Sequence, residues 1–251
     1  MLIAALYDIH GNLPALEAAV EAVRGKAVDL IVVGGDAIPG PMPNESLDLL
    51  KSLPAPALFL SGNGEREVLA VRAGGIPNLP TRFHPMMQWV ASELTTAHAD
   101  WIRSWPATVC LELSGRSTTL FCHATPTSDS AVFTNRSSEE VLRRQFDHVS
   151  ADRIVCGHTH VQFQRRFEHR TILNAGSVGM STTRGGAEWM LIDADATFEC
   201  TRFDHDAAAA RVRATNYPLA DEFAHSTILQ PPSADLLIAA YTEAAEAHVV
   251  R

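Results

Sequence analysis

The chain has 251 residues, of which 46% are hydrophobic and 20% are charged, so it can bury a core and is not disordered. Its formal net charge of −9 argues against a general nucleic-acid or membrane surface, although a local metal ion could still attract a small anionic substrate. No apolar stretch reaches the roughly 18–20 residues of a membrane span, and the N-terminus lacks a basic leader, so we expect a cytoplasmic protein.

The cysteines indicate free thiols rather than disulfides. None of them belongs to a C-x-x-C pair, and three lie in apolar strand-like runs, so we expect buried thiols in a reducing compartment. The four are Cys110, Cys122, Cys156 and Cys200. Cys122 directly precedes His123, and Cys156 opens the block Cys-Gly-His-Thr-His, but on a strand their side chains should point away from those of their neighbours, which predicts core positions.

The first 65 residues alternate between strand-like and helix-like segments. Apolar runs over residues 2–7, 28–36 and 56–63 predict strands, the first of them buried on both faces. Asn12 can cap a helix that follows the first run, and residues 44–53 predict a second helix. This β-α-β-α-β order predicts a parallel core with right-handed crossovers.

The middle of the chain is predicted to change from helices to a hairpin. Residues 64–106 predict helices, because apolar residues recur there at helical spacing. Strand-like runs at 108–113 and 118–123 then flank Ser-Gly-Arg-Ser, a hairpin turn signal. Ser137 and Glu140 match a capping box, which predicts that a helix begins there.

Closely spaced strand-like runs follow and predict an antiparallel half after the parallel one. They come after a further strand at 153–157 and cover residues 162–169, 171–176, 188–193 and 197–203. From about residue 204 the chain is Ala-rich and helical. We therefore predict one α/β (α+β) domain over residues 1–251, with two sheets and outer helices. It would include a helical insertion at about 64–106 and a helical C-terminal tail.

Potential metal ligands lie at or just after the ends of several of the predicted strands. They are Asp8, His10, Asp36, Asn63, His123, His158 and His160. Because the carboxyl ends of parallel strands meet at one edge of an open α/β sheet, we expect these side chains to converge. Carboxylates with imidazoles suit divalent transition metals. So many ligands exceed one tetrahedral site but suit two ions that share a bridge.

Each of these residues also has a structural alternative. Asp8 could cap the following helix, and Asn63 before a glycine is an ordinary turn residue. His123 could be a satisfied core histidine, and the pair His158 and His160 could be solvated. All of these blocks coincide with strand ends in this order, which favours the metal centre over separate structural roles.

Five sequence blocks resemble the calcineurin-like metallophosphoesterase family, whose pattern is D-x-H, G-D, G-N-[HDCT]-[DE], H and G-H-x-H. Here they read DIH, GGD, GNGE, CHATP and GHTH, in the same order. NAGSVG at 174–179 is similar to the family's N-P-G-S-V-G segment, with Ala175 where proline is usual. The resemblance covers roughly residues 1–200, is nearest to the small prokaryotic phosphodiesterase branch, and implies a β-sandwich flanked by helices.

The resemblance implies two divalent metal ions per chain, with manganese as the first choice and iron, nickel, cobalt or zinc as alternatives. The implied ligands are Asp8, His10 and His160 for one ion, Asn63, His123 and His158 for the other, and Asp36 bridging both. In this interpretation, side-chain alternation along an extended segment turns His158 and His160 toward different ions.

The resemblance also implies a phosphoester hydrolase in which a hydroxide bridging the two ions attacks phosphorus in line. In many members a histidine after the motif's asparagine assists the leaving group, but here that residue is Gly64. This departure favours a phosphodiesterase acting on good leaving groups. Phosphomonoesterase, protein phosphatase and dinucleoside polyphosphate hydrolase activities are the alternatives. Glu65 is expected to be a first-turn helix charge rather than a replacement for the histidine.

The candidate substrate-binding residues are Asn12, Arg66 and Arg136. Arg66 follows Asn63 in the helical segment and Arg136 lies in the loop after His123, where a guanidinium can clamp a phosphate through two hydrogen bonds. Both arginines have the ordinary alternative of a solvated surface position. Asn12 has the alternative of a helix cap.

We expect a small phosphoester as the partner, with no stable nucleic-acid partner and no membrane, because no basic stripe is present. The oligomeric state is left open. A different class of function is a non-catalytic interaction module of the same fold. Such modules usually lose metal ligands, whereas this sequence keeps the full set.

Overall fold

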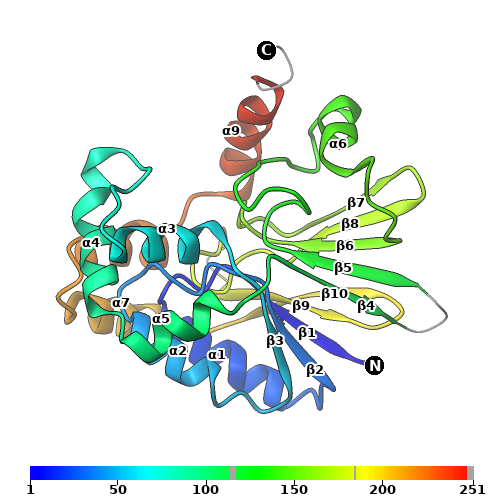
Figure 1. Cartoon of the computed structure of the whole chain (residues 1–251). Coiled ribbons are helices and arrows are strands. Elements are labelled where there is room, and N and C mark those ends of the chain that lie inside the picture. The colour runs from blue at the N-terminus through cyan, green and yellow to red at the C-terminus, as the bar shows by residue number, and fades with distance from the viewer. Residues whose placement is uncertain (114–116, 184, 248–251) are drawn as a thin grey trace.

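The computed structural model describes residues 1–113, 117–183 and 185–247. Two five-stranded sheets pack face to face and carry helices on their outer sides (Figure 1). This arrangement confirms the predicted two-sheet α/β sandwich. The predicted turn at residues 114–117 lies largely outside the described residues.

The first sheet has the strand order β10-β9-β1-β2-β3. Its parallel part consists of β1 (Ile3–Leu6), β2 (Leu30–Val33) and β3 (Ala57–Phe59), as the sequence predicts. β9 (Ala187–Ile192) pairs antiparallel with β1, and β10 (Ala196–Thr201) pairs antiparallel with β9. The loops that follow the parallel strands therefore lie at one edge of this sheet.

The second sheet has the order β4-β5-β6-β8-β7. β5 (Thr118–Cys122), β6 (Arg153–Cys156) and β8 (Arg170–Asn174) are parallel to one another, and the edge strands β4 (Thr108–Glu112) and β7 (Phe163–Phe167) are antiparallel. The prediction that the last strands form one antiparallel half is therefore wrong, because they are divided between the two sheets. The last two strands, β9 and β10, join the first sheet, and β8 pairs in parallel with β6.

Side-chain alternation along β1 divides the core into layers. Ile3, Ala5 and Tyr7 face the second sheet, whereas Ala4 and Leu6 pack against helices. This explains why the whole run is apolar. The inter-sheet layer is also pinned by a hydrogen bond, because the buried Tyr7 hydroxyl donates to the carbonyl of residue 155 on β6 at 3.1 Å.

Most of the helices contribute to the core cluster on the outer face of the first sheet. They are α1 (Leu13–Arg24), α2 (Pro43–Leu50), α3 (Asn63–Arg72), α4 (His84–Glu93), α5 (Thr96–Arg103) and α7 (His205–Arg213). The segment predicted to be helical, 64–106, thus supplies α3, α4 and α5. On the second sheet, α6 (Glu139–Phe146) packs against a separate cluster.

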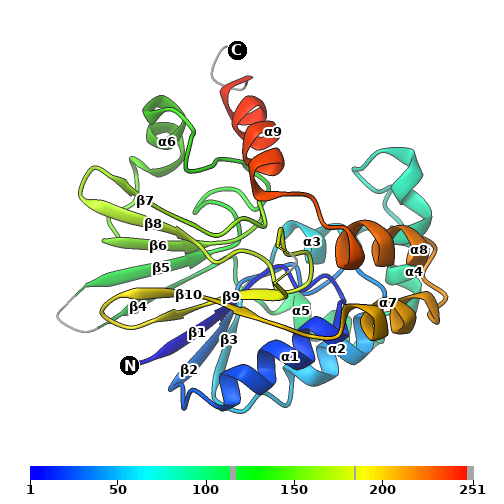
Figure 2. The same ribbon diagram turned by 180° about the vertical axis from the view of Figure 1, so that it is seen from behind.

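The C-terminal segment crosses from one side of the molecule to the other. After α7 come α8 (Ala220–Phe223), a π-helical turn (Ala224–Leu229) and α9 (Ala234–Ala247). Figure 2 shows α8 near α4, and α9 beside α6 at the opposite sheet. Within the described residues, no helix has the length and apolar character needed to cross a bilayer.

Two local predictions need correction. Ser138, rather than Ser137, caps α6, because its hydroxyl accepts a hydrogen bond from the Val141 N–H at 3.3 Å. All four cysteines are free, but only Cys122 and Cys156 are buried. Cys110 and Cys200 are exposed because they lie on the edge strands β4 and β10, where one strand neighbour is missing.

Candidate metal centre

The predicted metal ligands come together where β1, β2, β5 and β6 end. They form two groups, in each of which the potential ligand atoms lie within 4.8 Å of one another. The groups are Asp8, His10 and His160, and Asp36, His123 and His158. Asn63 joins the second group, since its Oδ1 lies 3.1 Å from His123 Nε2.

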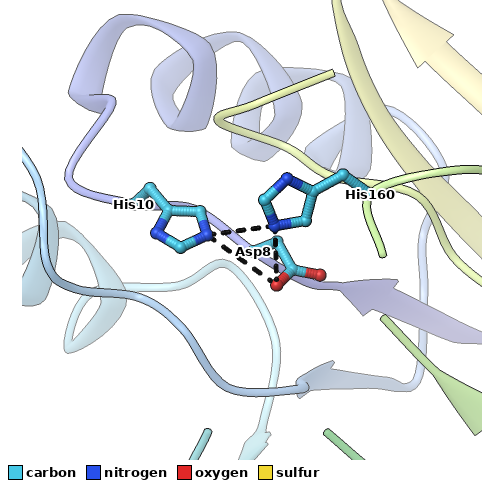
Figure 3. Close-up of side chains that lie close together, drawn as sticks. All are labelled: Asp8, His10 and His160. Atoms are coloured by element: carbon cyan, nitrogen blue, oxygen red, sulfur yellow. Dashed lines mark hydrogen bonds and ion pairs between the residues drawn. The ribbon is translucent and has the colours of Figure 1, made fainter. Parts of the chain in front are cut away.

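The first group contains a buried carboxylate oxygen that faces two ring nitrogens (Figure 3). Asp8 Oδ1 lies 3.3 Å from His160 Nε2 and 3.9 Å from His10 Nε2, and the two nitrogens are 3.2 Å apart. Asp8 Oδ2 accepts a hydrogen bond from the His158 N–H at 2.8 Å, but Oδ1 has no hydrogen-bond partner among the described residues. Because burying an unsatisfied carboxylate oxygen is costly, this arrangement fits a bound cation.

The second group shows the same need for positive charge. His123 Nδ1 donates to the Gly34 carbonyl at 3.0 Å, so its Nε2 faces Asn63 Oδ1 and, at 3.5 Å, Asp36 Oδ1. Burial lowers the pKa of His123, but the carboxylates of Asp36 and Asp8 outweigh burial and raise the pKa to about 10. A divalent cation would supply the charge that this proton otherwise provides.

Asp36 lies between the two groups and presents one oxygen to each. Its Oδ2 is 3.7 Å from His10 Nε2, and its Oδ1 is 3.5 Å from His123 Nε2. Burial opposes ionisation, but the rings of His123, His10 and His158 hold the pKa of Asp36 well below its usual range. His158 stays neutral, since burial and then His123 lower its pKa to about 4. At neutral pH the second group and its bridge therefore offer an ionised Asp36 carboxylate and a neutral His158 ring, whereas His123 keeps its proton.

The backbone at the candidate ligands is unusual. Five of them have a left-handed backbone: Asp8 (φ 54°), His10 (φ 49°), Asp36 (φ 50°), His158 (φ 66°) and His160 (φ 58°). Side chains rarely adopt this conformation, and it concentrates at functional sites. His158 and His160 do belong to different groups, but the predicted reason was wrong, because they are not on an extended segment.

Residues 174–179 form hydrogen bonds to the backbone of the loops that carry the first group. The Ser177 hydroxyl donates to the Asp8 carbonyl at 2.7 Å, and Asn174 Nδ2 donates to the Gly157 carbonyl at 2.6 Å. A side chain at position 157 would not fit, because a Cβ there would lie 2.3 Å from Asp8 Oδ2. Residues 174–179, which resemble the family's N-P-G-S-V-G segment, thus help to fix the position of Asp8.

A model of the calcineurin-like phosphoesterase superfamily domain matches residues 1–197. The chain belongs to this superfamily. Among proteins of similar sequence is an uncharacterised protein of Methanocaldococcus jannaschii, which is 25% identical over 184 residues, or 70% of each chain.

Two solved structures of low sequence identity share the fold of this chain. A metallophosphoesterase from Sphaerobacter thermophilus has a TM-score of 0.71 at 22% identity and covers 92% of this chain and 98% of its own. A hypothetical protein from Pyrococcus horikoshii has a TM-score of 0.78 at 14% identity and covers 92% and 99%. The family model ends at residue 197, but each of these two structures covers 92% of the 251 residues. In both comparisons the structural similarity therefore extends into the C-terminal segment.

Glu65 is a buried acid of the calcineurin-like centre whose role the sequence did not reveal. It lies in the first turn of α3, as predicted, but it is 0% exposed. Its carboxylate accepts hydrogen bonds from the N–H groups of Asp36, Ala37, Ile38 and Gly62 at 2.7–3.3 Å. Burial, and then the Asp36 carboxylate, raise its pKa to about 7. Glu65 therefore positions the loop of Asp36 through hydrogen bonds to its backbone.

The fold also explains the glycine that departs from the family pattern. A Cβ at Gly64 would lie 2.2 Å from the Ile38 carbonyl oxygen and 2.8 Å from Pro39 Cδ. The Gly64 N–H in turn donates to Asp36 Oδ1 at 2.7 Å. A side chain at position 64 would have to displace the loop of Asp36. Introducing the family's histidine is therefore not a clean test of its role.

Arg66 lies next to the second group but is already paired. Its guanidinium donates to both carboxylate oxygens of Asp129, at 2.6 and 3.0 Å, and to Glu67 at 2.7 Å. Asp129 and His123 line a cavity of about 360 Å³. Contact between Arg66 and a substrate stays a prediction, and it would require the Asp129 pair to rearrange.

The other two substrate-binding candidates are used within the fold. Arg136 donates to Asp235 of α9 at 2.7 Å and lines neither of the cavities beside the metal groups. Asn12 is buried, with Nδ2 donating to the Gly179 carbonyl at 2.8 Å and Oδ1 accepting from the Ala15 N–H. These contacts support the helix-cap alternative for Asn12 and do not favour a substrate contact.

Proposed function

We propose that the chain is a phosphodiesterase that depends on two divalent metal ions, with manganese as the first choice. The observation that carries the proposal is the position of Asp36, whose two oxygens face different candidate metal groups at 3.5 and 3.7 Å. Membership of the phosphoesterase superfamily supports the reaction class.

When bound, two such ions activate water as a nucleophile and neutralise charge that develops on the phosphoryl group. In this proposal, Asp8, His10 and His160 would hold one ion, Asn63, His123 and His158 would hold the other, and Asp36 would contribute to both. Glu65 and residues 174–179 keep the loops of these ligands in place. The chain's own contribution is to orient the ligands before substrate arrives.

Two features support a diester over a monoester. Position 64 has no room for a side chain that could protonate a poor leaving group. Two cavities adjoin the centre, one lined by His10 and His160 and the other by His123. Separate cavities leave space for an organic group on each side of one phosphorus atom.

The experiment compares hydrolysis of bis(p-nitrophenyl) phosphate and p-nitrophenyl phosphate by the manganese-loaded full chain. We expect the diester to be the better substrate by kcat/KM. Asp36→Asn is expected to lower kcat/KM on the order of 100-fold or more, because the shared carboxylate loses its charge. Asp206→Asn, at an exposed position on α7, is the matched control and should leave activity unchanged.

The outcomes separate the alternatives. Equal or better turnover of the monoester would contradict the diester preference. Full activity of Asp36→Asn with metal bound would contradict the shared carboxylate. Metal analysis that finds about two ions per chain without turnover of any phosphoester would favour the non-catalytic module.

A further inference from the structure

A cavity of about 410 Å³ opens beside the first metal group and shares His10 and His160 with it. Its volume lies in the range of small-molecule sites. Any organic group attached to a phosphoryl group held at Asp8, His10 and His160 would have this cavity as a neighbour. The cavity therefore adjoins the candidate metal site, and apart from His10 and His160 its lining residues are not candidate metal ligands.

The wall of this cavity comes largely from the C-terminal segment, beyond residue 197, where the family model ends. Tyr217, Phe223, Leu237 and Tyr241 contribute from α8, α9 and the connection before them, and Phe83, just before α4, lines the same cavity. Segments far apart in the sequence thus build one pocket, and the superfamily motif does not define it.

The lining is apolar and carries no basic side chain apart from the two histidines. Among the described residues that line it there is no lysine or arginine, and Glu222 contributes a negative charge. A polyphosphate or a nucleic-acid backbone would need cationic partners at this position. The lining thus disfavours a second anionic group and favours an uncharged one.

The aromatic wall is held in place before any ligand binds. The Tyr217 ring packs edge-on against Trp89 at 5.5 Å and against Phe223 at 6.2 Å between centroids. The hydroxyls of Tyr217 and Tyr241 have no hydrogen-bond partner in the described part of the chain. Tyr241 lines the same cavity as His10 and His160, and burial first, then the Asp8 carboxylate, raise the pKa of its phenol.

We propose that this cavity binds the organic group of the phosphoester substrate, and that this group is uncharged, largely apolar and about the size of an aryl ring. The proposal rests on the proposed function, because it assumes that the phosphoryl group binds at the adjacent metal group. The aromatic wall provides apolar contact, and the free phenol hydroxyls allow one or two polar atoms on the ring.

The test measures binding rather than turnover. Methylphosphonate, phenylphosphonate and 1-naphthylphosphonate, whose P–C bond is not hydrolysed, are titrated calorimetrically into the manganese-loaded full chain. We expect phenylphosphonate to bind at least about tenfold more tightly than methylphosphonate, or about 1.4 kcal/mol. A carboxylate on the ring, as in 4-carboxyphenylphosphonate, is expected to weaken binding relative to phenylphosphonate.

A matched pair of variants on α9 locates the effect. Leu237 lines the cavity, whereas its neighbour Leu236 does not and is 62% exposed. We expect Leu237→Ala to reduce the phenyl-over-methyl ratio to about threefold or less, and Leu236→Ala to keep it. Tyr241→Ala, with folding checked by circular dichroism, should act like Leu237→Ala.

Each result decides between the proposals. Equal affinity for the three phosphonates in the unaltered chain, or an unchanged ratio in both Leu237→Ala and Tyr241→Ala, would overturn the pocket while leaving the metal-dependent function intact. If the metal-loaded protein binds none of the phosphonates but hydrolyses bis(p-nitrophenyl) phosphate, the pocket proposal fails and the proposed function stands. If it neither binds the phosphonates nor hydrolyses a phosphoester, both proposals fail.

Discussion

Glu65 shapes the candidate metal centre through hydrogen bonds to the backbone. Its carboxylate accepts hydrogen bonds from four N–H groups, three in the Asp36 loop and one at Gly62. Each carboxylate oxygen accepts two of these bonds. Glutamine has a single acceptor oxygen and would turn an NH₂ group toward other donors.

Glu65→Gln is therefore expected to destabilise the protein by about 2–4 kcal/mol, since each lost bond to a charged group is worth about 1.5–3 kcal/mol. It should also weaken manganese binding, because the Asp36 loop is no longer held. Thermal unfolding and metal titration measure the two effects, with the exposed Glu93→Gln as the control. Unchanged metal affinity would contradict a positioning role.

Glu188 on β9 is a second buried acid, and it leads to a pH-dependent prediction. Burial raises its pKa from the usual 4.5 to about 7, and its Oε2 has no hydrogen-bond partner among the described residues. In the unfolded chain the acid ionises at lower pH than in the fold. The free energy of unfolding therefore falls as pH rises from about 4.5 to about 7.

Glu188→Gln removes this ionisation and should make the metal-free protein more stable than the unaltered chain at pH 8, by about 2–3 kcal/mol. At pH 4 the two proteins should differ little, so the acid measurement is the internal control. Urea unfolding with a chelator present gives both values. A gain of equal size at both pH values would show that charge is not the cause.

The candidate ligands were predictable at the residue scale because they lie at the ends of apolar runs in a recognisable order. Glu65 was not, because its burial depends on the loop after β2 lying over α3. The crowding at Gly64 depends on Ile38 and Pro39, which no local pattern brings there. Contacts between loops of different strands are therefore what the sequence leaves open.

At the scale of elements, α9 is attached to the second sheet through polar contacts with the region before α6. Glu246 accepts hydrogen bonds from the Ser138 N–H at 2.7 Å and from its hydroxyl at 2.9 Å. The Thr242 and Thr134 hydroxyls form a third contact at 2.6 Å. The charge of Glu246 thus lies at the N-terminus of α6, where the helix dipole favours it.

Glu246→Gln should lower the free energy of unfolding by about 1 kcal/mol, because the site is partly exposed to solvent. This corresponds to a decrease in Tm of about 2–4 °C for a chain of this size. Glu243→Gln, at an exposed position on the same helix, is expected to leave Tm unchanged. Equal effects of the two substitutions would argue against the link between α9 and α6.

The elements themselves were largely predictable, but their partners across the sheets were not. The runs at 2–7, 28–36 and 56–63 contain β1, β2 and β3, since apolar periodicity is a local property. The pairing of Ile3 with Ile192 is not local, because it joins positions at opposite ends of the domain that the family model matches. Nothing near either residue signals this pairing.

At the scale of the whole molecule, two carboxylates and four imidazoles converge on a small volume contributed by both sheets. Added Mn²⁺ should stabilise the fold, because ions that bind only the native state raise its stability by mass action. At concentrations about 100-fold above Kd this is about 2.7 kcal/mol per site, so we expect a rise in Tm of at least about 5 °C.

Differential scanning fluorimetry with and without Mn²⁺ measures this rise, and excess chelator should reverse it. Asp36→Asn is expected to lose most of the stabilisation. If manganese, cobalt, nickel and zinc all leave Tm unchanged, the centre does not bind metal. The cavity beside it was beyond the reach of sequence analysis, since its wall combines Phe83 with residues after position 216.

The left-handed backbone at Asp8, His10, Asp36, His158 and His160 affects how mutagenesis of the centre must be designed. Aspartate, histidine and asparagine tolerate this conformation better than other side chains. Alanine scanning would therefore impose a conformational penalty at each position in addition to removing the functional group. Asparagine replacements keep the local preference, so the change they produce does not include this backbone penalty.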